Sequence, residues 1–181
     1  MSLRRVRLSA AMSLDGFIAT EDGGYDWIPM DPDIDFGALF AGYDTILMGR
    51  KSYEDAQRAG HLAMYGAMRI LVCSRTLRPE EHPAVTVIRD PAPTVHALRA
   101  APGKDLWLFG GGELLRSCLD RDLVDELELA IVPVLLGAGR PLLPGGALHT
   151  RLRLLGHRLY PRTGTLLCRY AVERASHGAA G

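Results

Sequence analysis

Two junctions, each joining an apolar run to glycine and then to a helix-type segment, constrain the fold of this chain more than any other feature. The first lies in Asp44–Glu54, where the apolar run ends at Gly49. The second lies in Asp105–Ser117, around the triplet Gly110-Gly111-Gly112. Each pattern predicts a strand, a tight turn and the start of a helix. Strands that alternate with helices in this way are typical of α/β domains with a mainly parallel sheet.

The two junctions also predict where a ligand binds. At a helix start, several backbone N–H groups and the positive end of the helix dipole point at one spot, and phosphate is the natural ligand there. Two such sites in one small domain indicate a long cofactor with several phosphates. The alternative is that the glycines only make tight turns. Basic and hydroxyl residues near both junctions favour the phosphate interpretation, namely Arg50, Lys51, Ser52, Ser74 and Arg75.

Length and composition limit the classes of function. A chain of 181 residues with 48% hydrophobic residues fits one domain with a sizeable core. The formal net charge is +0 at pH 7 and the pI is about 7.0, so no global field attracts nucleic acid or an anionic membrane. No apolar run approaches the roughly 20 residues of a membrane span. We therefore expect a small-molecule ligand, and neither nucleic acid nor a membrane as a partner.

Cysteine and histidine usage predicts a reduced protein without a metal. The three cysteines, Cys73, Cys118 and Cys168, are far apart, and Cys73 and Cys168 stand in apolar strand patterns. Reduced thiols are typical of the cytoplasm. The six histidines lack metal-ligand spacing, and the N-terminal residues lack the apolar core of a signal peptide. The sequence therefore predicts a cytoplasmic protein with no metal site.

The hydrophobic periodicity predicts one domain over residues 1–174 and a disordered tail over residues 175–181. Helices are expected at 35–40, 52–58, 94–101 and 113–119. Strands are expected at 6–12, 17–19, 45–48, 69–73, 85–88, 106–109, 124–132, 152–160 and 165–172. The last two strands are expected to form a hairpin across Pro161–Gly164, which gives a mainly parallel sheet an antiparallel C-terminal edge.

A set of motifs that run in order over nearly the whole chain resembles the dihydrofolate-reductase-like family, in its branch of riboflavin-biosynthesis reductase domains. The matching segments are Ser13–Ala19, Asp26–Trp27, Leu47–Glu54, Val72–Thr76, Phe109–Leu115 and Val124–Gly137. The deaminase motifs H-x-E and P-C-x-x-C, which the bifunctional members also carry, do not occur together here. The resemblance implies a three-layer α/β fold, a mainly parallel sheet with antiparallel C-terminal edge strands, and an NADPH-dependent reductase.

The resemblance also implies which residues hold NADPH. The helix start that binds phosphates corresponds to Gly49, Arg50, Lys51 and Ser52. The strand end that meets the adenosine 2′-phosphate corresponds to Ser74 and Arg75. A guanidinium suits this role because it can grip a phosphate through two parallel hydrogen bonds.

The nicotinamide end of the site is implied in the same way. The turn under the pyrophosphate and nicotinamide corresponds to Gly110, Gly111, Gly112, Glu113, Leu114 and Leu115, and the pocket around the ring corresponds to Ala10, Ala11 and Ile18. Small side chains at Ala10 and Ala11 would let a flat ring approach the sheet, although both also fit an ordinary core. By the same resemblance, a cis peptide bond is expected between Gly110 and Gly111.

Members that reduce folate place a carboxylate in the first helix, facing the substrate. Asp35 and Asp33 both lie near that position, and the sequence does not choose between them. Asp35 can equally be the N-cap of that helix. Asp15 matches an acidic turn residue near the cofactor, although an Asp-Gly pair forms turns by itself. Trp27 matches an aromatic residue on a mobile loop over the active site, with a core anchor as the alternative.

The substrate stays open between several classes. Folate reductases carry an arginine before the third strand that clamps the glutamate tail, but Ala67 stands near that position and Arg69 is offset. Dihydrofolate is therefore expected to be a poor substrate. The first hypothesis is a reductase of an unidentified small heterocyclic or carbonyl compound. The second is a 5-amino-6-(5-phosphoribosylamino)uracil reductase or a dihydrofolate reductase, and the third is a non-catalytic NADPH-binding sensor or interaction domain.

The C-terminal half predicts an assembly surface. Leu127, Leu129 and Ile131 lie on one face of a strand, and the apolar run Val132–Leu136 follows. No helix is predicted to cover this face or the C-terminal edge, and uncovered apolar surface usually marks an interface. The sequence therefore predicts a two-fold symmetric homodimer that uses the C-terminal strands.

Overall fold

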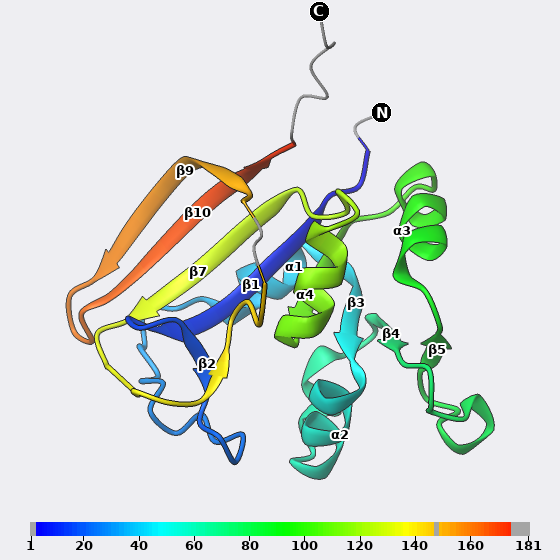
Figure 1. Cartoon of the computed structure of the whole chain (residues 1–181), viewed down its shortest axis with the longest axis horizontal. Coiled ribbons are helices and arrows are strands. Elements are labelled where there is room, and N and C mark those ends of the chain that lie inside the picture. Colours follow the sequence, from blue (N-terminus) through cyan, green and yellow to red (C-terminus); the bar gives the residue numbers. More distant parts are fainter. Residues whose placement is uncertain (1–2, 147–148, 175–181) are drawn as a thin grey trace, which may run out of the picture.

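Eight strands form one sheet in the order β5-β4-β3-β6-β1-β7-β10-β9, in a computed structural model that describes residues 3–146 and 149–174 (Figure 1). The strands are β1 (Val6–Ser13), β3 (Tyr43–Gly49), β4 (Arg69–Cys73), β5 (Thr86–Ile88), β6 (Asp105–Gly110), β7 (Glu126–Val132), β9 (Arg151–Tyr160) and β10 (Thr165–Glu173). All neighbours from β5 to β7 pair in parallel, whereas β10 is antiparallel to both β7 and β9. The mainly parallel sheet with an antiparallel C-terminal edge is thus confirmed.

Helices cover both faces of the parallel part of the sheet. They are α1 (Phe36–Ala41), α2 (Arg50–Arg58), α3 (Pro91–Ala100) and α4 (Gly112–Leu119), with short 3₁₀ helices η1 (His61–Tyr65) and η2 (Pro79–Glu81). Val95 of α3 and Leu114 of α4 pack with Leu8 of β1 in one core cluster. Tyr53 of α2 and Phe40 of α1 belong to the cluster on the other face. The two clusters confirm the three-layer arrangement.

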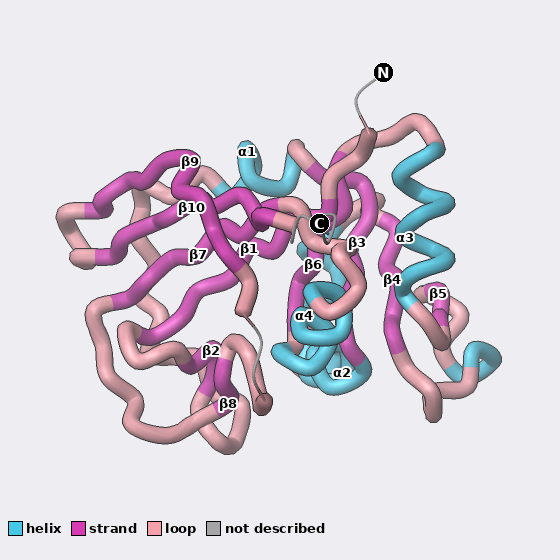
Figure 2. Tube along the Cα trace, turned by 45° about the horizontal axis from the view of Figure 1, so that its top comes forward, coloured by secondary structure: helices cyan, strands magenta, loops and turns pink. Residues whose placement is uncertain are grey.

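A second, two-stranded sheet stands beside the main one. It pairs β2 (Phe17–Ala19) with β8 (Arg140–Pro141) in antiparallel fashion. Figures 1 and 2 both show this ribbon at the same end of the molecule as α2. The sequence did not predict β8, because a two-residue strand has no periodicity.

Several element bounds differ from those expected, and the N-cap residues explain two of the differences. Helix α3 begins at Pro91 and not at Thr94, because Asp90 is the N-cap and accepts a hydrogen bond from the N–H of Ala92 at 3.0 Å. Helix α2 begins at Arg50 and not at Ser52, because the extended Gly49 already ends β3 and is the N-cap. The expected tail, residues 175–181, lies outside the described residues.

The expected cis peptide bond between Gly110 and Gly111 is wrong. Every peptide bond in the described part of the chain is trans. The turn that follows β6 is made by positive φ angles of 124° at Gly110 and 38° at Gly111. Glycine adopts such angles without the steric cost of a Cβ atom, so the chain can reverse here with a trans bond.

The expected uncovered face of β7 also needs correction. Leu127 and Leu129 are only 5% and 6% exposed, because they belong to the core cluster that α4 covers. Exposed apolar side chains instead concentrate on β9, where Leu154 is 52% and Leu159 is 57% exposed. The surface without a covering layer therefore lies one to two strands further toward the edge of the sheet.

Gly112 is the point where α4 meets the segment Pro141–Pro144, and it yields a test of the fold. A Cβ at Gly112 would lie 2.6 Å from Cδ of Pro144 and 2.8 Å from the carbonyl oxygen of Pro141. We expect Gly112→Ala to lower the free energy of unfolding by about 1–3 kcal/mol, the usual cost of overpacking. Denaturant titration measures this.

The matched control for that test is Gly156→Ala in β9, where a Cβ would meet no atom within 4 Å. We expect this variant to change the free energy of unfolding by less than about 0.5 kcal/mol. Equal midpoints for Gly112→Ala and the wild-type protein would show that the segment after β8 does not pack on α4 as described.

Candidate functional site

A cavity of about 1030 Å³ lies between the starts of α2 and α4 on one side and the β2–β8 ribbon with its loops on the other. Sites for small molecules and cofactors commonly reach this size. Its walls combine backbone from glycine turns, several cationic side chains and a group of aromatic rings.

The starts of two helices form the first wall. The N-caps of α2 and α4 are Gly49 and Gly111, and neither helix start has a hydrogen bond from a capping side chain. The two starts are close together, since a Cβ at Gly111 would lie 3.5 Å from Oγ of Ser52. The first N–H groups of a helix have no partner within it. Two sets of such donors therefore meet at one place, which suits an anionic ligand.

Four cationic side chains line the same cavity, and two of them have no counter-charge. Arg50 pairs with Glu54 at 2.9 Å, and Arg140 pairs with Asp55 at 3.0 Å. In the described part of the chain, the side chains of Lys51 and Arg75 have neither an ion pair nor a hydrogen bond. Free positive charge beside two helix starts favours a ligand with more than one phosphate.

Ser74 shapes the end of β4, where Arg75 follows. Its hydroxyl oxygen accepts hydrogen bonds from the N–H groups of Leu77 at 3.0 Å and Thr76 at 3.2 Å. The residue is 8% exposed, and its carbonyl accepts a hydrogen bond from Arg89 at 2.8 Å. Ser74 therefore fixes the turn that presents Arg75 to the cavity.

The far end of the cavity is lined by aromatic and apolar side chains: Tyr25, Ile28, His61, Tyr65 and Phe109. The hydroxyl of Tyr25 lies 3.5 Å from Nδ1 of His61, and the rings of Tyr65 and Phe109 are 5.6 Å apart at their centroids. Burial raises the pKa of Tyr65 to about 12, so its hydroxyl keeps its proton near neutral pH. This end of the cavity suits a planar, weakly polar ligand.

Cys73 also lines the cavity, but its chemistry there is limited. Burial raises the pKa of its thiol to about 12, so it stays protonated and is a poor nucleophile. All three cysteines are free, and Cys118 and Cys168 are buried. No group of three or more potential metal ligands occurs among the described residues. The Cys73 thiol therefore does not suit the role of a covalent nucleophile in this cavity.

The structure brings all the residues expected to bind cofactor together. Thirteen of them line the cavity: Ala10, Ala11, Ile18, Gly49, Arg50, Lys51, Ser52, Ser74, Arg75, Gly111, Gly112, Glu113 and Leu114. The remaining two, Gly110 and Leu115, line a small pocket of about 10 Å³ that shares Ala10, Ile18 and Gly111 with the cavity. Segments far apart in the chain thus meet as expected, while cofactor binding itself stays a prediction.

The four residues expected to act on the substrate do not line the cavity. Asp35 is the N-cap of α1 and accepts a hydrogen bond from the N–H of Ala38 at 2.8 Å. The exposed Asp33 accepts a hydrogen bond at its carbonyl from Arg158, at 3.4 Å. Trp27 donates its indole N–H to the carbonyl of Gly24 at 3.3 Å.

Asp15 likewise holds a turn. Its carboxylate accepts hydrogen bonds from Oγ of Ser13 at 2.5 Å and from the N–H of Gly137 at 2.7 Å. The hydrogen bond from Ser13 and, to a smaller extent, that from Gly137 lower the pKa of this carboxyl below its usual value. The local interpretations weighed for Asp35 and Asp15 thus describe what these side chains do here, and a catalytic role for any of the four stays a prediction.

Sequence reasoning missed two charged residues of the cavity, Asp55 and Arg140. Asp55 had a usable signal, because it follows Lys51 by four positions and Ser52 by three on one helix, which places all three on one face. Arg140 had none, since it reaches the cavity only through the unexpected pairing of β8 with β2. Arg69, the offset arginine near the expected folate clamp, is exposed on β4 and does not line the cavity.

Comparison with known proteins agrees with this geometry. Residues 4–165 match the RibD C-terminal domain family. The chain belongs to this family. Among its relatives, the uncharacterized protein YyaP of Bacillus subtilis is 35% identical over 168 residues, which cover 87% of this chain and 89% of YyaP. Membership supports an oxidoreductase of the riboflavin-pathway reductase type.

Solved structures show the same fold. A protein of Shewanella sp. PV-4 that is named for riboflavin biosynthesis superposes with a TM-score of 0.80 at 24% identity, covering 94% of this chain and 99% of that one. The Thermotoga maritima deaminase/5-amino-6-(5-phosphoribosylamino)uracil reductase superposes with a TM-score of 0.70 at 15% identity, covering 94% of this chain and 57% of that one. At these identities the likeness establishes the dihydrofolate-reductase-like fold. In the described residues, no helix has both the length and the apolar character that crossing a membrane requires.

Proposed function

We propose that this protein is an NADPH-dependent reductase that delivers a hydride to a small heterocyclic or carbonyl substrate. One observation carries the proposal: two helix starts without capping side chains meet in one cavity beside the unpaired cations Lys51 and Arg75. NADPH supplies the hydride when bound. Its pyrophosphate fits the donors at Gly49–Ser52 and at Gly111–Glu113, and its nicotinamide fits between Ala10, Ala11 and Ile18.

The choice of NADPH over NADH rests on Arg75. This arginine follows the end of β4, lines the cavity and has no counter-charge among the described residues. A free guanidinium is suited to a phosphate monoester such as the adenosine 2′-phosphate, which NADH lacks. Arg50 is a weaker candidate, because Glu54 already engages its guanidinium through contacts of 2.9 and 3.0 Å.

The aromatic end of the cavity supports a planar substrate stacked beside the nicotinamide. The structurally similar Thermotoga maritima protein is, by its name, a reductase of 5-amino-6-(5-phosphoribosylamino)uracil. A pyrimidine is therefore the second candidate. Dihydrofolate is expected to be a poor substrate, because Ala67 stands near the position where folate reductases carry their clamping arginine. The competing proposal of another class is a non-catalytic NADPH-binding sensor or interaction domain.

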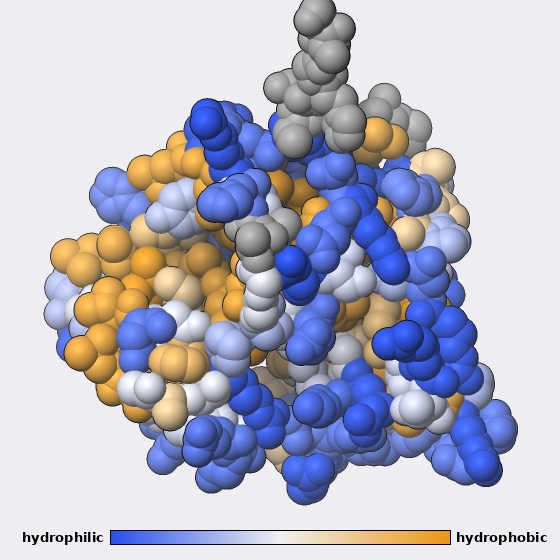
Figure 3. Space-filling view, viewed as in Figure 1, coloured by the Kyte–Doolittle hydropathy of each residue, from blue (hydrophilic) through white to orange (hydrophobic). Residues whose placement is uncertain are grey.

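We also propose that two chains pair through the C-terminal strands, in a cytoplasmic homodimer. Cross-strand partners share one sheet face. Two rows of such partners run from the core to the edge, one made of Ile131, Leu166 and Leu159 and the other of Leu127, Tyr170 and Leu154. These rows are buried or half-buried on β7 and exposed on β9. Figure 3 shows hydrophobic surface gathered over this end of the molecule. A second copy would cover it symmetrically.

The reductase proposal is tested by NADPH oxidation, followed as loss of absorbance at 340 nm, with a panel of pyrimidines, pterins and small carbonyl compounds. We expect turnover with at least one planar heterocycle or carbonyl compound, and poor turnover of dihydrofolate. Tight NADPH binding without turnover across the panel would favour the sensor. Efficient dihydrofolate turnover would contradict the expected substrate class.

Arg75→Ala tests cofactor choice. We expect this variant to lose about 1–3 kcal/mol of NADPH binding free energy, the range for charge-assisted hydrogen bonds, and to bind NADH as the wild-type protein does. Titration calorimetry measures both affinities. Arg78→Ala is the matched control, since Arg78 is a nearby surface arginine that pairs with Glu81 at 3.4 Å outside the cavity. Equal losses for NADPH and NADH would show that Arg75 does not bind the 2′-phosphate.

The double variant Leu154→Arg with Leu159→Arg tests the homodimer. For the wild-type protein, light scattering at micromolar concentration should give twice the 19.7 kDa mass of one chain. The variant should give the mass of one chain, because it places two charges in the proposed apolar interface. Met64→Arg is the control, since Met64 is 62% exposed on η1, away from these strands. A monomeric wild-type protein would contradict the proposal.

A further inference from the structure

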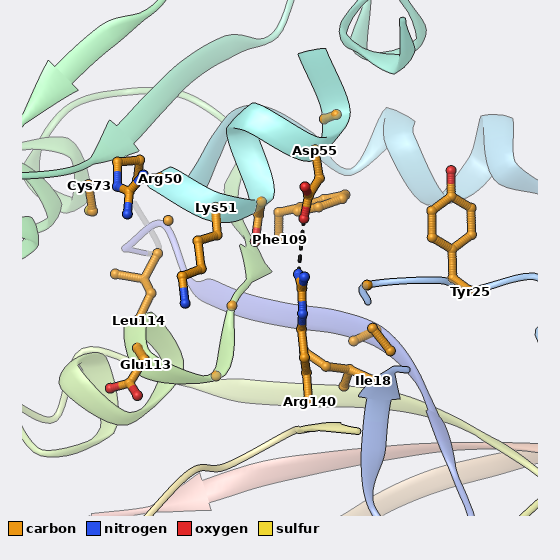
Figure 4. Close-up of a pocket in the computed structure, with 18 of the residues that line it drawn as sticks. Ile18, Tyr25, Arg50, Lys51, Asp55, Cys73, Phe109, Glu113, Leu114 and Arg140 are labelled. Atoms are coloured by element: carbon orange, nitrogen blue, oxygen red, sulfur yellow. Dashed lines mark hydrogen bonds and ion pairs between the residues drawn. The ribbon is translucent and has the colours of Figure 1, made fainter. Parts of the chain in front are cut away.

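An ion pair crosses the cavity between its two walls. Nη1 of Arg140, on β8, lies 3.0 Å from Oδ2 of Asp55, on α2. Figure 4 shows this pair between Arg50, Lys51, Cys73, Glu113 and Leu114 on one side and Tyr25 on the other. The pair therefore stands where the phosphate-binding half of the cavity meets its aromatic half.

Asp55 and Arg140 are the charged side chains of the lining that lie next to the aromatic half. Among the described residues that line the cavity, the only carboxylates are Asp55 and Glu113, and Glu113 lies beside Leu114 at the start of α4. The other arginine and lysine residues of the lining lie elsewhere: Arg50 and Lys51 are at the start of α2, and Arg75 follows the end of β4. The aromatic half also has three polar groups without a formal charge, namely the hydroxyls of Tyr25 and Tyr65 and the ring of His61.

The fold directs Arg140 into this position through two glycines. A Cβ at Gly23 would lie 2.7 Å from Nη2 of Arg140, so the loop before Trp27 leaves room for the guanidinium. A Cβ at Gly139 would lie 2.3 Å from the carbonyl oxygen of Ala19, so only glycine permits β8 to approach β2 this closely. Both glycines have positive φ angles, 94° and 155°. The backbone on either side of Arg140 is thus adapted to its placement.

The ion pair is accessible to a ligand, and breaking it costs little free energy. The side chains of Arg140 and Asp55 are 40% and 39% exposed, and ion pairs with this exposure are usually weak. The contact uses one Arg140 nitrogen, so the other donors of the guanidinium remain available. The second oxygen of Asp55 lies 3.2 Å from Arg58, and each carboxylate oxygen can accept more than one hydrogen bond.

We propose that Asp55 and Arg140 together recognise the substrate, by binding one edge of a planar heterocycle that carries a C=O next to an N–H. Arg140 donates to the ring carbonyl, and Asp55 accepts the ring N–H. Two adjacent contacts of opposite polarity fix the ring in its plane, beside the nicotinamide site, as bidentate recognition requires. This inference rests on the proposed function for the identity of the site, and it names the residues that choose the ligand.

Two probes test the assignment by titration calorimetry. The first is 6-aminouracil, which has ring N–H groups next to carbonyls, and the second is 6-amino-1,3-dimethyluracil, in which methyl groups replace these hydrogens. We expect wild-type protein to bind the first probe at least about tenfold more tightly. Asp55→Ala should remove this preference, and Arg140→Ala should weaken both probes by about tenfold, since both keep their carbonyls.

NADPH affinity distinguishes substrate recognition by Asp55 and Arg140 from a purely structural ion pair between the two walls. Both variants should bind NADPH within about twofold of wild type, because the helix starts, Lys51 and Arg75 are untouched. Arg121→Ala is the matched control, as Arg121 pairs with Asp90 at 2.8 Å, at similar exposure, outside the cavity. Equal losses for NADPH and both probes in Asp55→Ala would overturn the inference.

Two further outcomes overturn the inference. One is wild-type protein that binds neither probe or does not distinguish them, and the other is an unchanged preference in Asp55→Ala. The titrations are run with and without NADPH, so that they do not depend on the reductase proposal. Failure of NADPH to bind wild-type protein would contradict the reductase proposal. The preference between the two probes would still be measured without cofactor.

Discussion

The parallel pairing of β3 with β6, which places Met48 opposite Gly110, is the constraint on which the cavity depends. Parallel neighbours end at the same edge of a sheet, so the helices that follow them, α2 and α4, start side by side. Because these helices lie on opposite faces, their first N–H groups meet over the strand ends. The proposed anion-binding character of the site therefore follows from backbone topology, and Lys51 and Arg75 add charge to it.

The proposed phosphate-binding part of this arrangement could be predicted from the sequence because its signals are local. Gly49 and Gly110–Gly112 stand directly between an apolar run and a helix-type segment, and Lys51 and Arg75 adjoin strand ends. Alternation of strands with helices then places these junctions at one edge. The sheet and its antiparallel edge needed no further information. The family resemblance was needed to expect all fifteen cofactor residues at one place, because Ala10, Ala11 and Ile18 have no such local signal.

The substrate end was not open to prediction in the same way, because it is built from long-range contacts. Arg140 and Tyr25 reach the cavity from segments without hydrophobic periodicity, and Arg140 stands on a strand of only two residues, β8. Asp35 and Asp15 show the converse difficulty. A short carboxylate before a helix or in a turn finds backbone N–H groups nearby, and these local bonds compete with any distant role. Residue type and position alone cannot decide that competition.

The two halves of the cavity therefore differ in how they can change. Backbone groups at Gly49 and Gly111 cannot be replaced by side-chain substitution, and a Cβ at Gly112 would strike the segment after β8, so the phosphate half is tied to the fold itself. Apart from Phe109 on β6, the aromatic half depends on side chains of η1 and of the loops beside β2 and β8. Loops accept substitutions that strands and helix starts do not. Under the proposed function, one cofactor site would thus serve several substrates, and the pair of Asp55 on α2 with Arg140 on β8 would lie where the substrate is selected.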